Sequence, residues 1–266
     1  MTSPFKLSAN ISMLFVDLPF LDRIDAAADA GFSAVECQFP YAVAADEIAD
    51  RLAARGLVMN SINTPLGDVS AGEFGFAALP KRRSEFRAGF DRAMDYATRL
   101  KVATIHCMSG VPAPEARTAA RQTFLDNMQW AALIARTTGV DLVIEPLNGR
   151  DRPGYFVSRS DGVANLLRDL DEPNVKLLFD IYHIQIMEGD ILRRMEKHWP
   201  IIGHVQIASV PNRREPDEGE VAYPAILAEL AERGWGRFVG AEYNPRGKTL
   251  DGLGWAMPWL APSRKS

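Results

Sequence analysis

The feature that most constrains the fold is a phrase that repeats along the chain, in which an amphipathic helical segment ends at a glycine and a short apolar strand follows at once. It occurs at Gly31, Gly56, Gly139 and Gly234. Glycine suits this position because the residue after a helix often takes the left-handed conformation, which costs a residue without Cβ little. Each occurrence therefore predicts a helix, its cap and then a strand.

The segments between these phrases have the periodicity of helices rather than the alternation of strands. Two predicted helix faces are marked by Phe86, Phe90, Met94 and Ala97 and by Ile226, Leu227 and Leu230. Eight predicted strands alternate with the helices, and they cover residues 6–12, 34–38, 58–63, 104–108, 142–147, 175–180, 201–207 and 238–243.

Strict alternation of strand and helix selects a parallel sheet, because parallel neighbours need a crossover connection. An open doubly wound sheet also alternates, but eight units in 266 residues, without a linker or a break in composition, favour closure. We therefore predict an α/β fold, a single (β/α)8 TIM barrel, with residues 1–266 as one domain. Long polar loops at 64–83 and 211–220 follow strands, at the ends where such barrels place their active sites.

Composition and charge exclude several classes of protein. The chain is 47% hydrophobic and 24% charged, as in ordinary globular proteins rather than disordered or fibrous ones. Its net charge of −4 gives no general attraction for nucleic acid, whose binding depends on lysine and arginine. A signal-peptide pattern and an apolar run of about 18 residues are both absent, so we expect no membrane partner and a cytoplasmic location. Assembly into a homo-oligomer stays open.

In four consecutive predicted strands, a short apolar run ends in a side chain that can bind a metal or transfer a proton: Glu145, Asp180, Gln206 and Glu242. Residues at matching heights on the strands of a closed barrel converge, so these four would share one site. Carboxylates packed this closely raise one another's pKa unless a cation neutralises them. Oxygen ligands without a thiolate favour Mg²⁺ or Mn²⁺. Each residue alone could be an ion-paired or capping group, but four in succession favour a shared site.

Three further residues are candidates for substrate binding. His183 follows Asp180 by three residues and could reach a substrate oxygen, although a lone histidine is more often structural. Arg213 lies in the loop after Gln206, where its guanidinium could hold a carboxylate with two hydrogen bonds. His106 ends the fourth predicted strand and faces either the barrel mouth or the outer helices. Weaker candidates are Asn10, Glu36, Asn63, Asn148 and Arg214.

Taken together, the motifs around these residues resemble one known family. They are IEPLN, FDIYH, HVQIASVPNRREP and GAEYNP in the second half of the chain, and ANISMLF, VECQFPY, NTPLGD and IHCMSG in the first. This ordered set looks like the hydroxypyruvate isomerase family of the xylose isomerase-like barrels, close to the 2-oxo-tetronate isomerases. The resemblance covers nearly the whole chain.

The resemblance implies the roles of the candidate residues. One divalent metal ion, Mg²⁺ or Mn²⁺, would be bound by Glu145, Asp180, Gln206 and Glu242, and the two glutamates would also be the catalytic proton-transfer pair. His183 and Arg213 would bind the substrate. One departure is visible in the loop after the third predicted strand, where Phe74 stands at a position at which the family leads us to expect arginine.

The implied activity is the interconversion of hydroxypyruvate and tartronate semialdehyde, or of a closely related 2-oxo-tetronate, through a metal-stabilised enediolate. The substrate would be a small hydroxy-oxo acid. The alternatives are a ketose 3-epimerase of the same superfamily, an AP-endonuclease-like DNA repair enzyme and a non-catalytic sugar-acid binding protein. Arg213 favours the isomerase over the epimerase, and four histidines with an acidic charge balance fit a histidine-rich, multi-metal nuclease poorly.

Overall fold

The computed structural model describes residues 5–261, and within them eight parallel strands form a closed barrel. Each strand pairs with the next, and β1 pairs with β8 to close the ring. The strands are β1 Lys6–Asn10, β2 Ala34–Cys37, β3 Val58–Asn63, β4 Thr104–His106, β5 Asp141–Ile144, β6 Val175–Asp180, β7 Ile202–Ile207 and β8 Phe238–Ala241. The predicted TIM barrel is confirmed. The predicted domain, residues 1–266, extends at both ends beyond the described residues.

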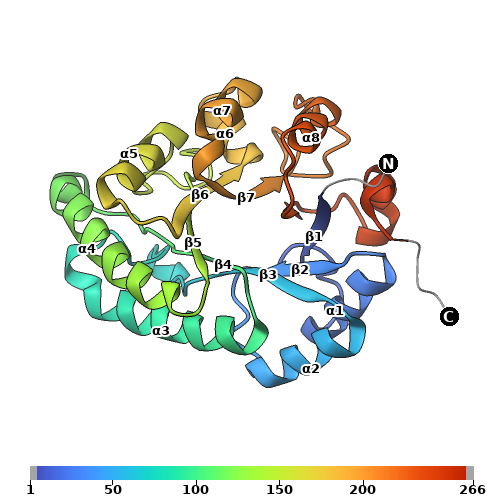
Figure 1. Ribbon diagram of the computed structural model, residues 1–266, viewed down its shortest axis with the longest axis horizontal. Helices are drawn as coiled ribbons and strands as arrows, with labels where there is room; N and C mark the ends of the chain where they lie inside the picture. The colour runs from blue at the N-terminus through green and yellow to red at the C-terminus, as the bar shows by residue number, and fades with distance from the viewer. Residues whose placement is uncertain (1–4, 262–266) are drawn as a thin grey trace.

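Eight α-helices of the described chain surround the barrel (Figure 1). They are α1 Phe20–Asp29, α2 Ala45–Arg55, α3 Arg83–Leu100, α4 Arg117–Arg136, α5 Ser160–Leu170, α6 Ile181–Met187, α7 Ile191–His198 and α8 Tyr223–Glu232. Both α6 and α7 lie between β6 and β7, and the 3-10 segment Thr249–Trp259 follows β8. Phe5 stacks on Trp259, with ring centroids 6.2 Å apart. No helix within residues 5–261 has the length and apolar character needed to cross a membrane.

The glycines of the repeated phrase have the conformation that the sequence predicts. All four have positive φ, from 63° at Gly56 to 94° at Gly31. Gly56 is the left-handed cap of α2, and the other three come shortly after the ends of α1, α4 and α8. The predicted apolar faces of α3 and α8 are buried against the barrel. Apolar periodicity thus sets which side of each helix packs on the sheet.

The inside of the barrel is polar near its C-terminal end, although the layer between strands and helices is apolar. Side chains alternate along a strand, so every second residue faces the barrel axis. Asn10 on β1, Glu36 on β2, and His204 and Gln206 on β7 are all buried. Buried polar and charged groups are costly unless they are paired. These buried polar groups therefore indicate a functional site at the C-terminal end of the barrel.

Candidate active site

Glu145, Asp180, Gln206 and Glu242 come together at the C-terminal end of the barrel. Asp180 and Gln206 are register partners on β6 and β7, and Gln206 is in register with Gly240 on β8. Glu145 and Glu242 directly follow β5 and β8. All four side chains are buried. The convergence expected from the strand ends is thus present, whereas the roles of the four residues remain predictions.

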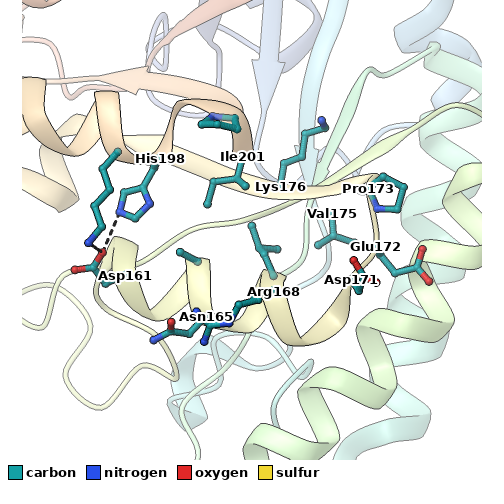
Figure 2. A pocket seen from close by; sticks show the side chains of 14 residues that line it. Asp161, Asn165, Arg168, Asp171, Glu172, Pro173, Val175, Lys176, His198 and Ile201 are labelled. Carbon is teal, nitrogen blue, oxygen red and sulfur yellow. Dashed lines mark hydrogen bonds and ion pairs between the residues drawn. The ribbon is translucent and has the colours of Figure 1, made fainter.

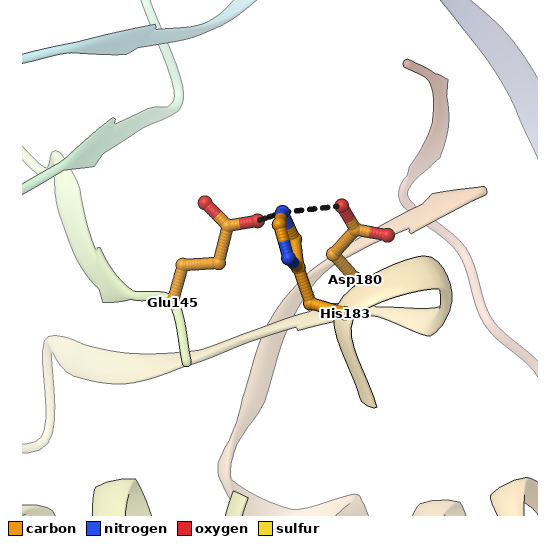
Figure 3. Close-up of side chains that lie close together, drawn as sticks. All are labelled: Glu145, Asp180 and His183. Atoms are coloured by element: carbon orange, nitrogen blue, oxygen red, sulfur yellow. Dashed lines mark ion pairs between the residues drawn. The ribbon is translucent and has the colours of Figure 1, made fainter. Parts of the chain in front are cut away.

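Glu145, Asp180 and His183 form a close group that could hold a metal ion, since one ligand atom from each lies within 4.8 Å of the others (Figure 3). His183 Nε2 is 3.6 Å from Glu145 Oε1 and 3.7 Å from Asp180 Oδ2. The backbone N–H of Asn148 donates to His183 Nδ1 at 3.1 Å. A neutral imidazole that accepts at Nδ1 carries its proton on Nε2, so Nε2 can donate a hydrogen bond to a bound molecule. This arrangement suits substrate binding by His183 better than metal ligation.

Three buried oxygens of the site make no hydrogen bond within the described chain: Glu145 Oε1, Asp180 Oδ2 and Gln206 Oε1. Buried polar atoms normally have a hydrogen-bond partner, so three such acceptors in one place call for an explanation. They come from β6, β7 and the residue after β5, which are neighbours in the barrel. Asp180 Oδ2 lies 3.6 Å from the Arg213 guanidinium without a hydrogen bond. Hard oxygen atoms that accept no hydrogen bond are ligands that Mg²⁺ and Mn²⁺ prefer. The residues present therefore fit a divalent cation.

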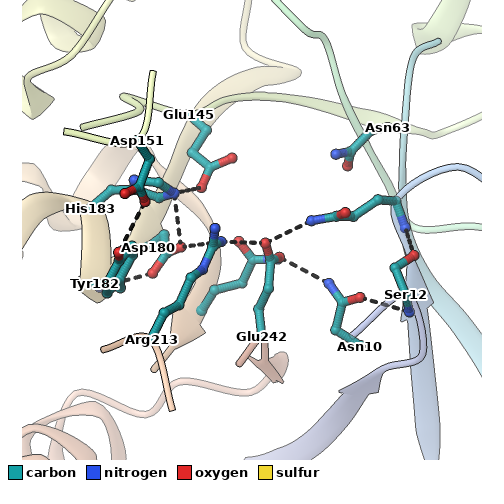
Figure 4. Close-up of polar contacts among 12 residues, drawn as sticks. Asn10, Ser12, Asn63, Glu145, Asp151, Asp180, Tyr182, His183, Arg213 and Glu242 are labelled. Carbon is teal, nitrogen blue, oxygen red and sulfur yellow. Dashed lines mark hydrogen bonds and ion pairs between the residues drawn. The ribbon is translucent and has the colours of Figure 1, made fainter. Parts of the chain in front are cut away.

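Glu242, in contrast, is surrounded by hydrogen-bond donors (Figure 4). Its Oε1 accepts from Gln38 Nε2 at 2.9 Å and from Arg213 Nη2 at 2.6 Å. Its Oε2 accepts from Asn10 Nδ2 at 2.9 Å and from Gln206 Nε2. A cation and the Arg213 guanidinium would thus compete for the same carboxylate.

Arg213 enters the site from the loop after β7. Its φ of 52° lies in the left-handed region, which is strained for a residue with a side chain. Two backbone hydrogen bonds hold this conformation: Arg213 N donates to Ser209 O, and Asn244 N donates to Arg213 O, both at 2.8 Å. The guanidinium lies 3.6 Å from Asp180 Oδ2 in addition to its bond with Glu242. The loop therefore holds one positive charge between two carboxylates.

Burial shifts the proton affinities of these groups. It raises the pKa of Glu145 well above its usual range, and the carboxylates of Asp180 and Glu242 raise it further. Burial raises the pKa of Glu242 to about 8, although Arg213 acts in the opposite direction. Burial and then the charge of Arg213 hold the pKa of His183 well below its ordinary value. Buried carboxyl groups with raised pKa values beside a neutral imidazole are typical of sites that transfer protons.

Glu36, on β2, orients the side chain of Gln206 through a hydrogen bond. Glu36 Oε1 accepts from Gln206 Nε2 at 2.7 Å and from Asn10 Nδ2 at 3.2 Å. Glu36 Oε2 lies 2.9 Å from His204 Nε2. Because Glu36 and Glu242 both bind the Nε2 end of Gln206, its Oε1 is the end left without a partner. Glu36, only a weak candidate from the sequence, thus orients a predicted metal ligand.

Gly240 leaves the space that the Glu36 carboxylate fills. A Cβ at Gly240 would lie 2.5 and 2.6 Å from the two carboxylate oxygens of Glu36. We expect Gly240→Ala to displace this carboxylate and to lower the free energy of unfolding by about 1–3 kcal/mol, as overpacking typically does. Urea unfolding measures the change. Gly236→Ala is the control, since its Cβ would meet nothing closer than 3.9 Å. Equal stability of the two variants would contradict the tight fit.

The site opens into a cavity of about 480 Å³, a size typical of small-molecule sites. The predicted site residues that line it are Glu145, His183, Arg213 and Glu242, together with the weaker candidate Asn63. Those outside the lining are Asp180, Gln206 and His106.

His106 lies beside Glu145 rather than at the cavity. Its Nδ1 is 3.3 Å from Glu145 Oε2, and neither ring nitrogen makes a hydrogen bond within the described chain. Burial, with a smaller effect from His204, lowers the pKa of His106 to about 3. A neutral histidine in this position neighbours a proposed proton-transfer group, and its predicted contact with the substrate stays a prediction.

The cavity lining also includes residues that the sequence reasoning did not single out, among them Gln38, Arg152 and Tyr182. Gln38 is the last residue of the predicted strand 34–38, so the strand-end pattern that selected Glu145 would have found it too. Arg152 lies in the charged run RDRPG after β5, and Tyr182 follows Asp180 in FDIYH. Only the folded chain places these two side chains at the site, Arg152 from the loop after β5 and Tyr182 from the first turn of α6.

A second and larger cavity, of about 870 Å³, lies between α5 and α7 beside the N-terminal end of β6, away from the C-terminal ends of the strands (Figure 2). Its lining mixes acidic and basic side chains that pair with one another. Lys197 Nζ donates to Asp161 Oδ1 at 2.6 Å, and His198 Nε2 lies 3.1 Å from the same oxygen. None of the predicted site residues lines this cavity. The smaller cavity is therefore the candidate active site.

Comparison with known proteins agrees with the fold. Residues 24–262 match the family model described as xylose isomerase-like TIM barrel. The chain is 45% identical to a 2-oxo-tetronate isomerase of Pectobacterium atrosepticum over 256 residues, 96% of this chain and 98% of that one. It is 37% identical to the hydroxypyruvate isomerase of Escherichia coli K12 over 255 residues, 96% and 99% of the two chains. A crystal structure described as AP endonuclease, family 2, from Brucella melitensis has a TM-score of 0.94 and 44% identity, covering 96% of this chain and 99% of that one.

Proposed function

Because the chain belongs to the hydroxypyruvate isomerase and 2-oxo-tetronate isomerase family of xylose isomerase-like TIM barrels, we propose that it interconverts hydroxypyruvate and tartronate semialdehyde, or isomerises a closely related 2-oxo-tetronate. The observation that carries the proposal is the pair of buried glutamates, Glu145 and Glu242, that line one cavity at the C-terminal end of the barrel. The substrate is then a small hydroxy-oxo acid.

The reaction needs two proton transfers at neighbouring carbons. A base removes a proton from the hydroxymethyl carbon of hydroxypyruvate, and the electron pair left behind forms the double bond of an enediolate. An acid then returns a proton to the former carbonyl carbon, while the remaining hydroxyl proton moves between the two oxygens. Glu145 and Glu242 are the proposed pair, since both line the cavity and have raised pKa values. Such positioned groups contribute roughly 10²–10⁴-fold each.

The proposed cofactor is one divalent ion, Mg²⁺ or Mn²⁺. Glu145, Asp180 and Gln206 would hold it, and the three buried oxygens that make no hydrogen bond within the described chain support this assignment. Glu242 is the proposed fourth ligand. When bound, the ion would supply Lewis-acid stabilisation of the negative charge that develops on the substrate oxygens.

His183 and Arg213 are the proposed substrate-binding residues, since both line the cavity. His183 Nε2–H would donate to a substrate oxygen near Glu145. The guanidinium of Arg213 is already shared between Glu242 and Asp180. We therefore propose that Arg213 contacts the oxygens bound to the reacting carbons of the substrate. His106, proposed from the sequence as a third binding residue, would act next to Glu145.

The test is incubation with hydroxypyruvate and with 2-oxo-tetronates in D₂O, followed by NMR. We expect conversion to the isomer, with deuterium at the carbon that receives the returned proton. No turnover of any of these acids by metal-loaded protein would overturn the proposal. A ketose substrate whose carbonyl stays in place, but whose C3 inverts its configuration and gains deuterium, would instead indicate the 3-epimerase.

The structure described as an AP endonuclease raises the DNA repair alternative, and that description belongs to the Brucella protein. Here the described chain contains one group of three ionisable residues that could hold a metal, with a single histidine. A histidine-rich, multi-metal nuclease site would need more ligands than this group offers. The net charge of −4 also gives little attraction for DNA.

A further inference from the structure

Two arginines line the active-site cavity, and they differ in whether a carboxylate of the protein pairs with their charge. Arg213 bonds to Glu242 at 2.6 Å and lies 3.6 Å from Asp180. Arg152, from the loop after β5, makes no side-chain hydrogen bond or ion pair with any residue from 5 to 261. An anion that enters the cavity therefore finds one guanidinium without a carboxylate partner.

Arg152 lies on the apolar side of the cavity. Its guanidinium carbon is 3.8 Å from the ring centroid of Phe74, a cation–π contact. The Phe74 ring packs edge-on against Tyr155, with centroids 6.2 Å apart. Both rings belong to a small apolar cluster built around Met108, Leu147 and Tyr155. The cavity lining thus combines the carboxylates of Glu145, Glu242 and Asp151 with an apolar group, and Arg152 lies against Phe74 of that group.

The loop that carries Arg152 is held by its own hydrogen bonds. Arg152 N donates to Asn148 O at 3.0 Å, and Tyr155 N donates to Arg152 O at 3.2 Å. The neighbouring carboxylate, Asp151, is the nearest group in sequence that would neutralise Arg152. It accepts instead from Asn148 Nδ2 and Tyr182 Oη, both at 3.0 Å. The hydrogen bonds fix the backbone of Arg152, while its guanidinium stays available to bind an anion.

We propose that Arg152 binds the carboxylate of the substrate and so determines the preference of the enzyme for acids. The inference rests on the proposed isomerase function. The guanidinium of Arg213 is shared between Asp180 and Glu242, so Arg152 is the cavity-lining arginine available to the substrate. A guanidinium can hold a carboxylate with two parallel hydrogen bonds. Phe74, the position where the family resemblance led us to expect arginine, here supports an arginine from a different loop.

The test compares an acid with a neutral substrate of the same carbon number. We expect Arg152→Met to lower kcat/KM for hydroxypyruvate roughly 10-fold, the low end for a lost charge-assisted hydrogen bond because the side chain is solvent-exposed. The kcat/KM for dihydroxyacetone should stay unchanged. Arg150→Met is the matched control, since Arg150 is an exposed arginine two residues away that does not line the cavity. Circular dichroism checks that both variants fold, and Arg152→Gln replaces the methionine variant if it does not.

Equal losses for both substrates, or no loss for either, would overturn the role of Arg152 and leave the isomerase proposal standing. Calorimetry of glycerate binding tests Arg152 without turnover, because glycerate is an acid of three carbons that has no ketone or aldehyde group to isomerise. Arg152→Met should weaken this binding roughly 10-fold, and added salt should weaken the wild type more than the variant. Absence of turnover in the wild type, with glycerate binding still dependent on Arg152, would reject the reaction but keep the anion site.

Discussion

Glu145→Gln and Glu242→Gln are each expected to lower kcat for hydroxypyruvate by roughly 10²–10⁴-fold, the usual contribution of a positioned acid or base. Glutamine matches glutamate in volume but cannot accept the proton that the reaction moves. Both side chains are buried and line the cavity, so an amide fits the same space and the barrel should stay folded. Steady-state kinetics with metal-loaded protein give the effect, and circular dichroism checks the fold.

Isotope exchange separates the two glutamates. The variant that lacks the base for the first step should neither convert hydroxypyruvate nor exchange its carbon-bound proton with D₂O. The variant that lacks the acid for the second step should still exchange this proton without forming product. A variant with near-normal turnover would remove its residue from the proton-transfer pair. Loss of exchange in both variants, together with weaker metal binding, would assign the effect to the metal site.

The fold could be predicted because it depends on features that repeat. Helix-ending glycines recur at four places, Gly31, Gly56, Gly139 and Gly234, between segments with apolar helix faces. A register error in one strand does not change the alternation of strand and helix. The exact ends of the strands were predicted less accurately. Glu145 and Glu242 lie just beyond β5 and β8, although the predicted strands included them. This shift does not move the site, since residues at or just past the C-terminal ends of parallel strands still meet at one face of the barrel.

The hydrogen-bond network within the site could not be predicted in the same way. Gln206 was predicted from its position, but its orientation depends on Glu36, which is 170 residues away in the chain. Arg213 was predicted in the right loop, yet its place between Asp180 and Glu242 follows from a left-handed backbone that the sequence does not reveal. Arg152 needed the contact with Phe74 to be recognised. Such contacts join distant segments, and periodicity carries no information about them.

Removal of divalent metal is expected to abolish most of the activity, and Mg²⁺ or Mn²⁺ should restore it. Lewis-acid stabilisation of developing charge amounts to several kcal/mol, which corresponds to roughly a hundredfold or more in rate. The experiment dialyses the protein against a chelator, verifies metal content, and then titrates each ion back. Ca²⁺ and Zn²⁺ serve as comparison ions, because the oxygen-rich ligand set favours the harder, octahedral cations.

A readout independent of activity comes from binding itself. An ion that binds only the folded chain raises its stability, so the thermal midpoint should rise with metal concentration, and calorimetry should give one ion per chain. Asp180→Asn should weaken this binding, since it removes the charge from one of the three oxygens that make no hydrogen bond within the described chain. Full activity of metal-free protein would contradict the metal site. In that case the guanidinium of Arg213, already bonded to Glu242 and next to Asp180, would be the cation that balances these carboxylates.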